Sequence, residues 1–197
     1  MCYGSPSMNG FDVAVSYIAE EHVDDSDSVM VKGNYAKQYN SGHLKVGVAI
    51  ANIGKGKGLD EHEATAIVVS YDVGNYSVGG GWQDESDIGG VSGVDRDHLY
   101  IGASAKVGAQ GTAKLQWATS DGDGANSDAT QIAIGYDYAW DKHTTLFANY
   151  AKMDNDSGVM FSVNGKGHGD KVVPLAGDDP SALSLGIVYK FDVSLTK

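Results

Sequence analysis

The segment TQIAIGYDYAWDKHTTLFANYAK, residues 130–152, decides the fold class of this chain. From Ile132 to Trp140, apolar side chains occupy every second position and small or polar residues lie between them. A period of two residues is typical of a β-strand with one apolar and one polar face. Asp141-Lys142 interrupts the period, and a second strand follows over 143–152. The segment therefore predicts an antiparallel hairpin of two long strands.

The same alternation recurs along the chain. It is clear in 11–17, 44–50 and 183–191, and weaker in 64–72 and 144–152, where both faces carry apolar residues. Ten strands are predicted, over residues 10–19, 28–39, 43–51, 63–72, 75–83, 97–107, 111–119, 129–140, 143–152 and 181–191. Most exceed the usual globular length of about 5–6 residues. They match the ~9–11 residues that a tilted strand needs to cross a bilayer.

The predicted connections alternate between short and long. The short turns are Asn9-Gly10, 40–42, Val73-Gly74, 108–110 and Asp141-Lys142; the long loops are 20–27, 52–62, 84–96, 120–128 and 153–180. Outer-membrane barrels combine short periplasmic turns with long external loops, whereas Greek-key sandwiches have no reason to alternate in this way. The predicted fold is thus all-β, an antiparallel up-and-down transmembrane β-barrel.

Aromatic residues of the predicted apolar face fall near the strand ends. Those near short turns are Phe11, Tyr39, Tyr71, Tyr76, Tyr138, Trp140 and Phe191, and those near long loops are Tyr17, Trp82, Trp117 and Tyr150. Aromatic girdles flank the apolar band where amphipathic rings meet lipid headgroups. Strands are rich in aromatics in any case, so this prediction depends on its agreement with the strand lengths and the connections.

The charges separate into acidic loops and a mildly basic wall. The formal net charge of −12 argues against nucleic-acid binding, which needs a basic surface. Acids crowd the predicted long loops, and the polar face carries Lys32, Lys45, Lys106, Lys114 and Lys190 against Asp12 and Asp137. We predict that Lys32, Lys45, Lys106, Lys114, Asp12 and Asp137 line a pore. Alternatively, some of the lysines snorkel at the membrane interface.

No motif for catalysis, cofactor binding or metal binding is recognised. Cys2 is the only cysteine, which excludes an intramolecular disulfide and a cysteine-based metal site. GKGKG at 54–58 lacks the spacing of a P-loop, and GGVSGV at 89–94 lacks the second glycine of a nucleophile elbow. The chain is therefore not expected to be an enzyme, and no cofactor or metal is predicted.

Three segments resemble the Gram-negative outer-membrane general porins of the sixteen-stranded type. They are GSPSMNGFDVAVSY at 4–17, TQIAIGYDYAWDKHTTLFANYAKMDND at 130–156 and SALSLGIVYKF at 181–191. The resemblance implies the last ten of sixteen strands, with residues 1–5 as the tail of the sixth. Residues 1–197 would then be an N-terminally incomplete porin β-barrel domain, without a signal peptide or the constriction loop. The family normally ends on the last aromatic, whereas DVSLTK follows Phe191 here.

The resemblance implies a channel in the outer membrane for passive diffusion of small hydrophilic solutes and ions. It also implies contact with outer-membrane lipid and a homotrimer. One alternative is a non-conducting outer-membrane barrel that serves as an enzyme or a structural anchor. Another is a soluble secreted β protein whose acidic loops bind a partner. Acidic loops favour cations and a basic wall favours anions, so the sign of ion selectivity stays open.

Overall fold

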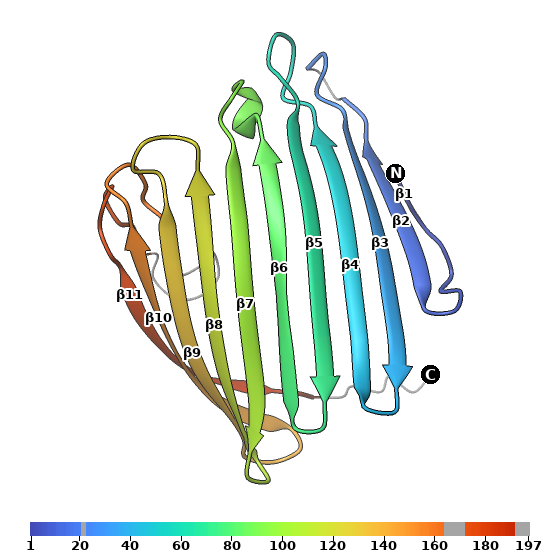
Figure 1. Ribbon diagram of the computed structural model, residues 1–197. Coiled ribbons are helices and arrows are strands. Elements are labelled where there is room, and N and C mark those ends of the chain that lie inside the picture. Colours follow the sequence, from blue (N-terminus) through green and yellow to red (C-terminus); the bar gives the residue numbers. More distant parts are fainter. Residues whose placement is uncertain (21–22, 164–171, 192–197) are drawn as a thin grey trace.

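The computed structural model describes residues 1–20, 23–163 and 172–191 as a single antiparallel β-sheet. Within these ranges, eleven strands follow one another in sequence order, and each pairs only with its neighbours along the chain (Figure 1). The predicted all-β, antiparallel up-and-down fold is confirmed. The segment 1–5, expected as the tail of a preceding strand, contains the short edge strand β1.

The strands have these bounds: β1 Cys2–Gly4, β2 Phe11–Ile18, β3 Ser28–Tyr39, β4 Gly42–Ile53, β5 His62–Val73, β6 Tyr76–Ser86, β7 Arg96–Val107, β8 Gly111–Gly122, β9 Ala129–Ala139, β10 Thr144–Asn155 and β11 Ser181–Tyr189. A short 3-10 helix, η1 (Ile88–Gly90), lies between β6 and β7. No helix in the described part of the chain has the length and apolar character needed to traverse a bilayer.

The strand ends on the long-loop side differ most from the predicted ones. β6, β8 and β10 each run three residues beyond the predicted end. The added residues are mostly polar, and the hydrophobic alternation stops before them, but the backbone hydrogen-bond ladder depends on pairing and not on side-chain polarity. At the other end, β11 stops at Tyr189, two residues before Phe191. The segment DVSLTK lies outside the described residues, as do 164–171 of the last long loop and 21–22 of the first.

Short turns and long loops occupy opposite ends of the sheet (Figure 1). The turn before β2 shows the hairpin chemistry: Asn9 and Gly10 have positive φ values of 53° and 88°, and Met8 and Phe11 bridge across them. Two positive φ values are the signature of a type I′ turn, which matches the right-handed twist of paired strands. The tight turns at 40–41 and 74–75 contrast with the connections 54–61 and 87–95. The predicted alternation is present.

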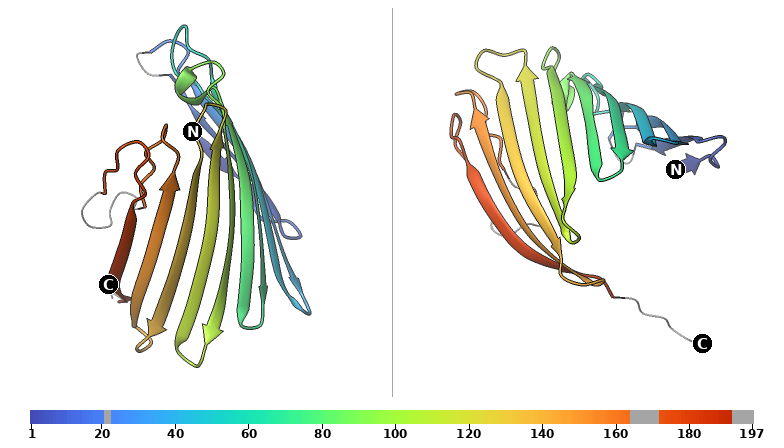
Figure 2. Two further views of the ribbon diagram at one scale, coloured as in Figure 1. Left: turned by 60° about the vertical axis from the view of Figure 1, so that its left-hand side comes forward. Right: turned by 60° about the horizontal axis from the view of Figure 1, so that its bottom comes forward.

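The sheet is a single curved layer without a packed core (Figure 2). Among the described residues, only four hydrophobic side chains count as buried: Ala51, Ala129, Met153 and Val159. Large aliphatic residues are instead open on one side, with Leu115 54% and Leu185 73% exposed. A continuous apolar surface of this kind marks contact with another apolar phase or a partner. This sheet therefore needs an apolar environment on one face.

Candidate functional site

Strand register sorts the side chains into two chemically distinct faces. Directly opposed residues in an antiparallel pair project to the same side of the sheet. The apolar face contains Phe11, Val31, Ile50, Ile67, Trp82, Ile101, Leu115, Ile134, Tyr150 and Leu183. The polar face contains the residues between them. The two segments of weak parity, 64–72 and 144–152, follow the same division.

All six predicted pore-lining residues project from the polar face. Their cross-strand partners there are Asn34 for Asp12, Ala49 for Lys32, Ser70 for Lys45, Thr112 for both Lys106 and Asp137, and Ser104 for Lys114. The alternation in the sequence thus predicted which side of the sheet these residues occupy. Their role in lining a pore stays a prediction.

A continuous row of mostly polar residues crosses this face from β3 to β11. The polar row consists of Gln38, His43, Asp72, Ser77, Ser104, Lys114, Gly135, Asn149 and Ser184, each directly opposite the next. Gly135 is the single break, and the Asn149 amide lies against it. Hydroxyl, amide and charged groups on successive strands therefore form a continuous band of side chains that can hydrogen-bond water.

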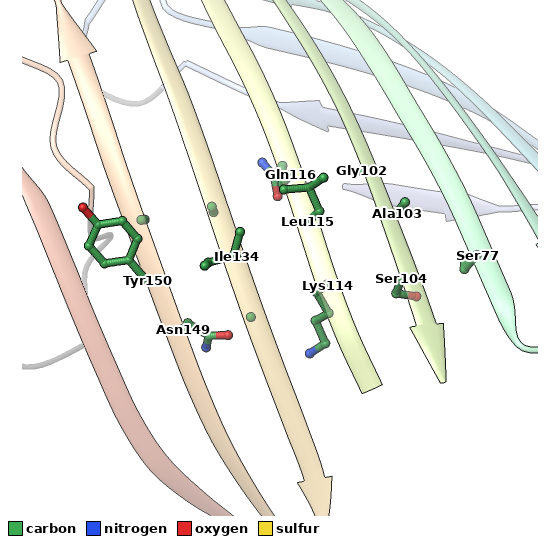
Figure 3. Close-up of a pocket in the computed structure, with 13 residues that line it drawn as sticks. Ser77, Gly102, Ala103, Ser104, Lys114, Leu115, Gln116, Ile134, Asn149 and Tyr150 are labelled. Carbon is green, nitrogen blue, oxygen red and sulfur yellow. The ribbon is translucent and has the colours of Figure 1, made fainter. Parts of the chain in front are cut away.

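Part of the polar row borders a shallow hollow of about 360 Å³ (Figure 3). Ser77, Ser104, Lys114 and Asn149 lie along it, with Gln116 on the loop side. Small residues predominate in the row next to the polar row, among them Gly79, Gly102, Ala133, Ala151 and Ala182, although Lys45 and Gln116 also belong to it. Because these positions carry little or no side chain, the surface of the sheet is open to solvent there.

Ion pairs reduce the basic excess that the sequence suggested. Lys45 Nζ lies 3.0 Å from Asp72 Oδ2, and Lys114 pairs with Asp137. Asp72 was not assigned to a face because the parity of its segment was ambiguous, and register now places it with the polar residues. Lys32 and Lys106 have no ion-pair partner within the described ranges. The wall therefore carries both signs of charge close together.

Arg96 and three histidines also lie on the polar face, although they were not among the predicted pore-lining residues; of these, the alternation indicated the face of His43 alone. Arg96 lies opposite Glu85, and His98 lies opposite Gln83. His43 and His62 occupy the same face on β4 and β5. Arg96 and His62 lie at strand ends that extend beyond the apolar pattern, so parity alone gave no signal for them. The polar face therefore carries charged and titratable groups in addition to the lysines.

The predicted girdle residues lie on the apolar face. The members on the short-turn side lie at or near strand ends, whereas Trp82, Trp117 and Tyr150 lie near the middle of β6, β8 and β10, because these strands extend beyond their predicted ends. Those with a register partner are Phe11, Tyr39, Tyr71, Tyr76, Trp82, Trp117, Tyr138 and Tyr150. Trp140 and Phe191 lie just beyond the ends of β9 and β11. Tyr35, whose ring centroid lies 4.3 Å from that of Phe11, belongs to the same face and was not predicted. Their position at lipid headgroups stays a prediction.

Two of the predicted girdle residues donate hydrogen bonds from their polar atoms to other side chains. Trp82 Nε1 donates to Asp97 Oδ1 at 2.8 Å on the long-loop side. Tyr138 Oη donates to Gln110 Oε1 at 2.9 Å on the short-turn side. Aromatic rings on an apolar surface with polar tips in a wet layer are the arrangement that membrane interfaces favour.

Large side chains on the polar face are matched by glycine on the neighbouring strand. The Tyr100 ring lies against Gly81, where an added Cβ would come within 2.6 Å of the phenol oxygen. Phe147 covers Gly186 in the same way, and Val68 lies over Gly47. Glycine lets these side chains lie flat against the sheet instead of projecting from it, which keeps the polar face open.

The acidic loop residues mostly serve as acceptors for backbone N–H groups. Asp87 Oδ1 accepts from Gly93 N at 2.8 Å, and Asp128 Oδ1 accepts from Gly122 N at 3.2 Å. Among the described residues, no three His, Cys, Asp or Glu side chains are grouped so as to hold a metal ion. Cys2 is exposed and free.

Two comparisons of sequence identify relatives. A family model described as Gram-negative porin matches residues 1–158. Outer membrane porin protein 32 of Delftia acidovorans is 31% identical over 199 aligned residues, which cover 96% of this chain and 55% of the relative. The chain therefore spans about half the length of that curated relative.

Solved structures share the fold. A porin structure refined at 1.8 Å superposes with a TM-score of 0.65 at 17% identity, covering 96% of this chain and 60% of that one. The trimer form of in-vitro folded OmpT from Vibrio cholerae gives a TM-score of 0.61 at 15% identity, covering 95% of this chain and 63% of that one. At these identities, the likeness concerns the path of the strands.

Proposed function

The chain belongs to the Gram-negative porin family, and from that premise we propose that it forms part of the wall of an aqueous outer-membrane channel. Small hydrophilic solutes and ions would diffuse passively through this channel, along the polar face. Membership of the family assigns the chain to the outer membrane of a Gram-negative cell. The apolar face would contact the lipid.

The observation that carries the proposal is the difference between the two faces of one curved layer. The polar row runs across nine strands on one face of the sheet, while aliphatic and aromatic residues cover the other face. A channel wall needs a hydrated inner face for solutes and an apolar outer face for the bilayer. Charges of both signs on the inner face would then act on passing ions.

We propose that the barrel closes with strands beyond those of this chain. β1 and β11 form the two edges of the described sheet. In lipid, unpaired backbone groups at an edge cost several kcal/mol each, by order of magnitude, so spanning sheets close on themselves. We propose that residues 1–197 are the C-terminal part of a porin barrel domain and supply the last ten of sixteen strands, with β1 ending the sixth. By analogy with the trimer form of OmpT, the assembled protein would be a homotrimer.

An enzymatic role has less support than diffusion. The sequence contains no recognised catalytic motif, and the polar-face serines Ser16 and Ser77 donate hydrogen bonds to Cys2 Sγ and Asp72 Oδ1. The competing role is therefore that of a non-conducting barrel. Such a barrel would share the strands, the girdles and the lipid face, and it would differ only in solute flux.

Conductance of the full-length protein tests the proposal. The folded protein, verified by heat-modifiable migration in detergent gels, is added to a planar bilayer in potassium chloride. Stepwise increases in current are expected, and detergent without protein serves as the control. A verified folded barrel that inserts but gives no steps would refute the channel and favour the structural anchor. A protein that shows no heat-modifiable migration would refute the barrel itself.

A further inference from the structure

The connection after β10 turns back over the polar face and is held there by one buried side chain. Asn155, 6% exposed, lies at the end of β10. Its Nδ2 donates to Phe161 O at 2.9 Å and to Asp178 O at 2.7 Å, while Oδ1 accepts from Phe161 N at 3.2 Å. An amide with three hydrogen bonds to two parts of one connection fixes the path of the backbone around Phe161.

The Phe161 ring is fixed as well. It packs against the small buried cluster of Ala129, Met153 and Val159. The Arg96 guanidinium carbon lies 5.1 Å from the ring centroid, within the range of a cation–π contact. Arg96 Nη1 in turn donates to Ser120 Oγ and to Ser127 O, both at 2.9 Å. An aromatic ring is thus positioned over the polar face at its long-loop end.

A cavity of about 300 Å³ lies between Phe161 and the sheet. Four of its polar lining residues are His98, Tyr100, Gln116 and Gln131; Thr119 and Ser120 also line it, and Met153 and Ala118 add apolar surface. No hydrogen bond within the described ranges uses the side chains of these four polar residues. Tyr100 lines the cavity with its ring leaning over Gly81 of β6, and Phe161 supplies a ring from the connection.

The lining chemistry selects a class of ligand. It contains no carboxylate and no lysine, and the Arg96 guanidinium beside it is already engaged by Ser120, Ser127 and the Phe161 ring. An ion entering the cavity would therefore lose water without gaining an unengaged counter-charge, which is unfavourable. Two carboxamides supply both donors and acceptors, as paired hydroxyl groups require. The electron-rich faces of aromatic rings attract polarised C–H groups. The volume lies at the lower end of the roughly 300–1,000 Å³ range of ligand pockets.

We propose that this cavity is a binding subsite for a neutral, hydroxyl-rich solute of monosaccharide size at the mouth of the channel. The proposal rests on the proposed function for the route by which such a solute arrives. The Gln116 and Gln131 amides hydrogen-bond the hydroxyl groups, and the ring of Phe161 covers the less polar face of the sugar. A subsite of this kind makes the wall selective among neutral solutes without changing its charge.

Saturation-transfer NMR on the full-length protein in detergent tests binding directly, with methyl β-D-glucopyranoside as the probe. The native protein is expected to transfer magnetisation to the sugar ring protons. Gln131→Leu and Phe161→Leu should each reduce the signal at least fivefold. D-glucuronate, the same ring with a carboxylate, should give a signal at least threefold weaker than the glucoside.

Phe147→Leu is the matched control, because Phe147 is an aromatic residue on the same face but lies outside the cavity. Its signal should equal that of the native protein, and heat-modifiable migration shows which variants are folded. Equal signals in native protein and in the Gln131→Leu variant would overturn the subsite, as would an equal loss in the Phe147→Leu variant. Channel steps without sugar binding refute the subsite alone, whereas sugar binding without steps refutes the channel alone.

Discussion

Lys114 forms an ion pair with Asp137 across β8 and β9 on the polar face. Both side chains remain partly open to solvent, at 47% and 28% exposure. Exposed pairs of this kind contribute only about 0–1 kcal/mol to stability. The pair matters more for the local charge of the wall, because the acid cancels a lysine that would otherwise attract anions.

Asp137→Asn should therefore shift ion selectivity towards anions. A unit charge about 10 Å from a passing ion in water is worth about 0.4 kcal/mol, which corresponds to about a twofold change in the permeability ratio. The reversal potential of the full-length channel in a potassium chloride gradient measures this ratio. Asp97→Asn is the control, since Asp97 lies on the apolar face, and no shift is expected there. Equal shifts in both variants would contradict the assignment of faces.

Gly186→Ala should destabilise the folded protein. A Cβ at this position would overlap the Phe147 ring, and it would have to push the ring off the sheet. Overpacking of this kind costs typically about 1–3 kcal/mol. The urea midpoint of unfolding in detergent should fall, and adding Phe147→Ala should restore most of the loss.

Gly33→Ala provides the comparison for that test. Nothing lies within 4 Å of a Cβ built at Gly33, although it too lies inside a long strand. Replacing a strand glycine in open space relieves an entropic cost of about 0.5–1 kcal/mol, so its midpoint should stay constant or rise. A similar loss in both variants would show that the Phe147 contact is not the cause.

The strand pattern and the faces could be predicted from sequence because both follow from a period of two residues. The six charged residues named as pore-lining, from Asp12 to Asp137, share one side of the sheet for this reason. The ends of β6, β8 and β10 could not be predicted, since the ladder continues after the apolar pattern stops. There, backbone pairing decides the end of the strand, and the side chains carry little information.

Side-chain contacts between strands could not be predicted from the sequence, for a different reason. Two such contacts are the Lys45–Asp72 ion pair and the packing of the Tyr100 ring against Gly81. Each joins residues about 20–30 positions apart in the sequence. Each depends on register to within one residue, because a slip of one would send a side chain to the other face. Likewise, no pattern within 153–163 shows that Phe161 returns to the sheet, because Asn155 directs that path.

Trp82 and Trp140 should report the two rims of the membrane. Their indoles lie at the long-loop and short-turn sides of the apolar face, and Trp82 hydrogen-bonds a carboxylate there. Single-tryptophan variants of the full-length protein are placed in vesicles of lipids brominated near the headgroup or near the chain ends. Quenching should be stronger for bromine near the headgroup. Stronger quenching by deep bromine would contradict the girdle.

The turn between β9 and β10 should lose part of its stability in acid. Asp141 Oδ1 accepts from His143 N at 2.7 Å and from Thr144 N at 2.8 Å. The hydrogen bond from the His143 backbone holds the pKa of Asp141 below its ordinary value of 3.8. Since the folded pKa is depressed, this contribution is present above the unfolded value of about 3.9 and is lost as the pH falls through the folded one.

Urea midpoints of the native protein and of Asp141→Ala check this pH dependence. The native protein should be the more stable at pH 7, because its carboxylate satisfies two backbone N–H groups of the turn. At pH 3 the gap should be smaller. A gap of equal size at both values would show that the charged form of Asp141 is not what stabilises the turn.

Thiol accessibility at two adjacent positions of β7 tests the central claim most directly. Ser104 belongs to the polar row, and Ala103 faces the apolar side opposite Val78. In a Cys2→Ser background of the full-length protein, Ser104→Cys and Ala103→Cys are each treated with a bulky, membrane-impermeant methanethiosulfonate while single-channel current is recorded. A lasting fall in conductance is expected for Ser104→Cys, and no change is expected for Ala103→Cys. A fall confined to Ala103→Cys, or no fall in either channel, would contradict a pore lined by the polar face.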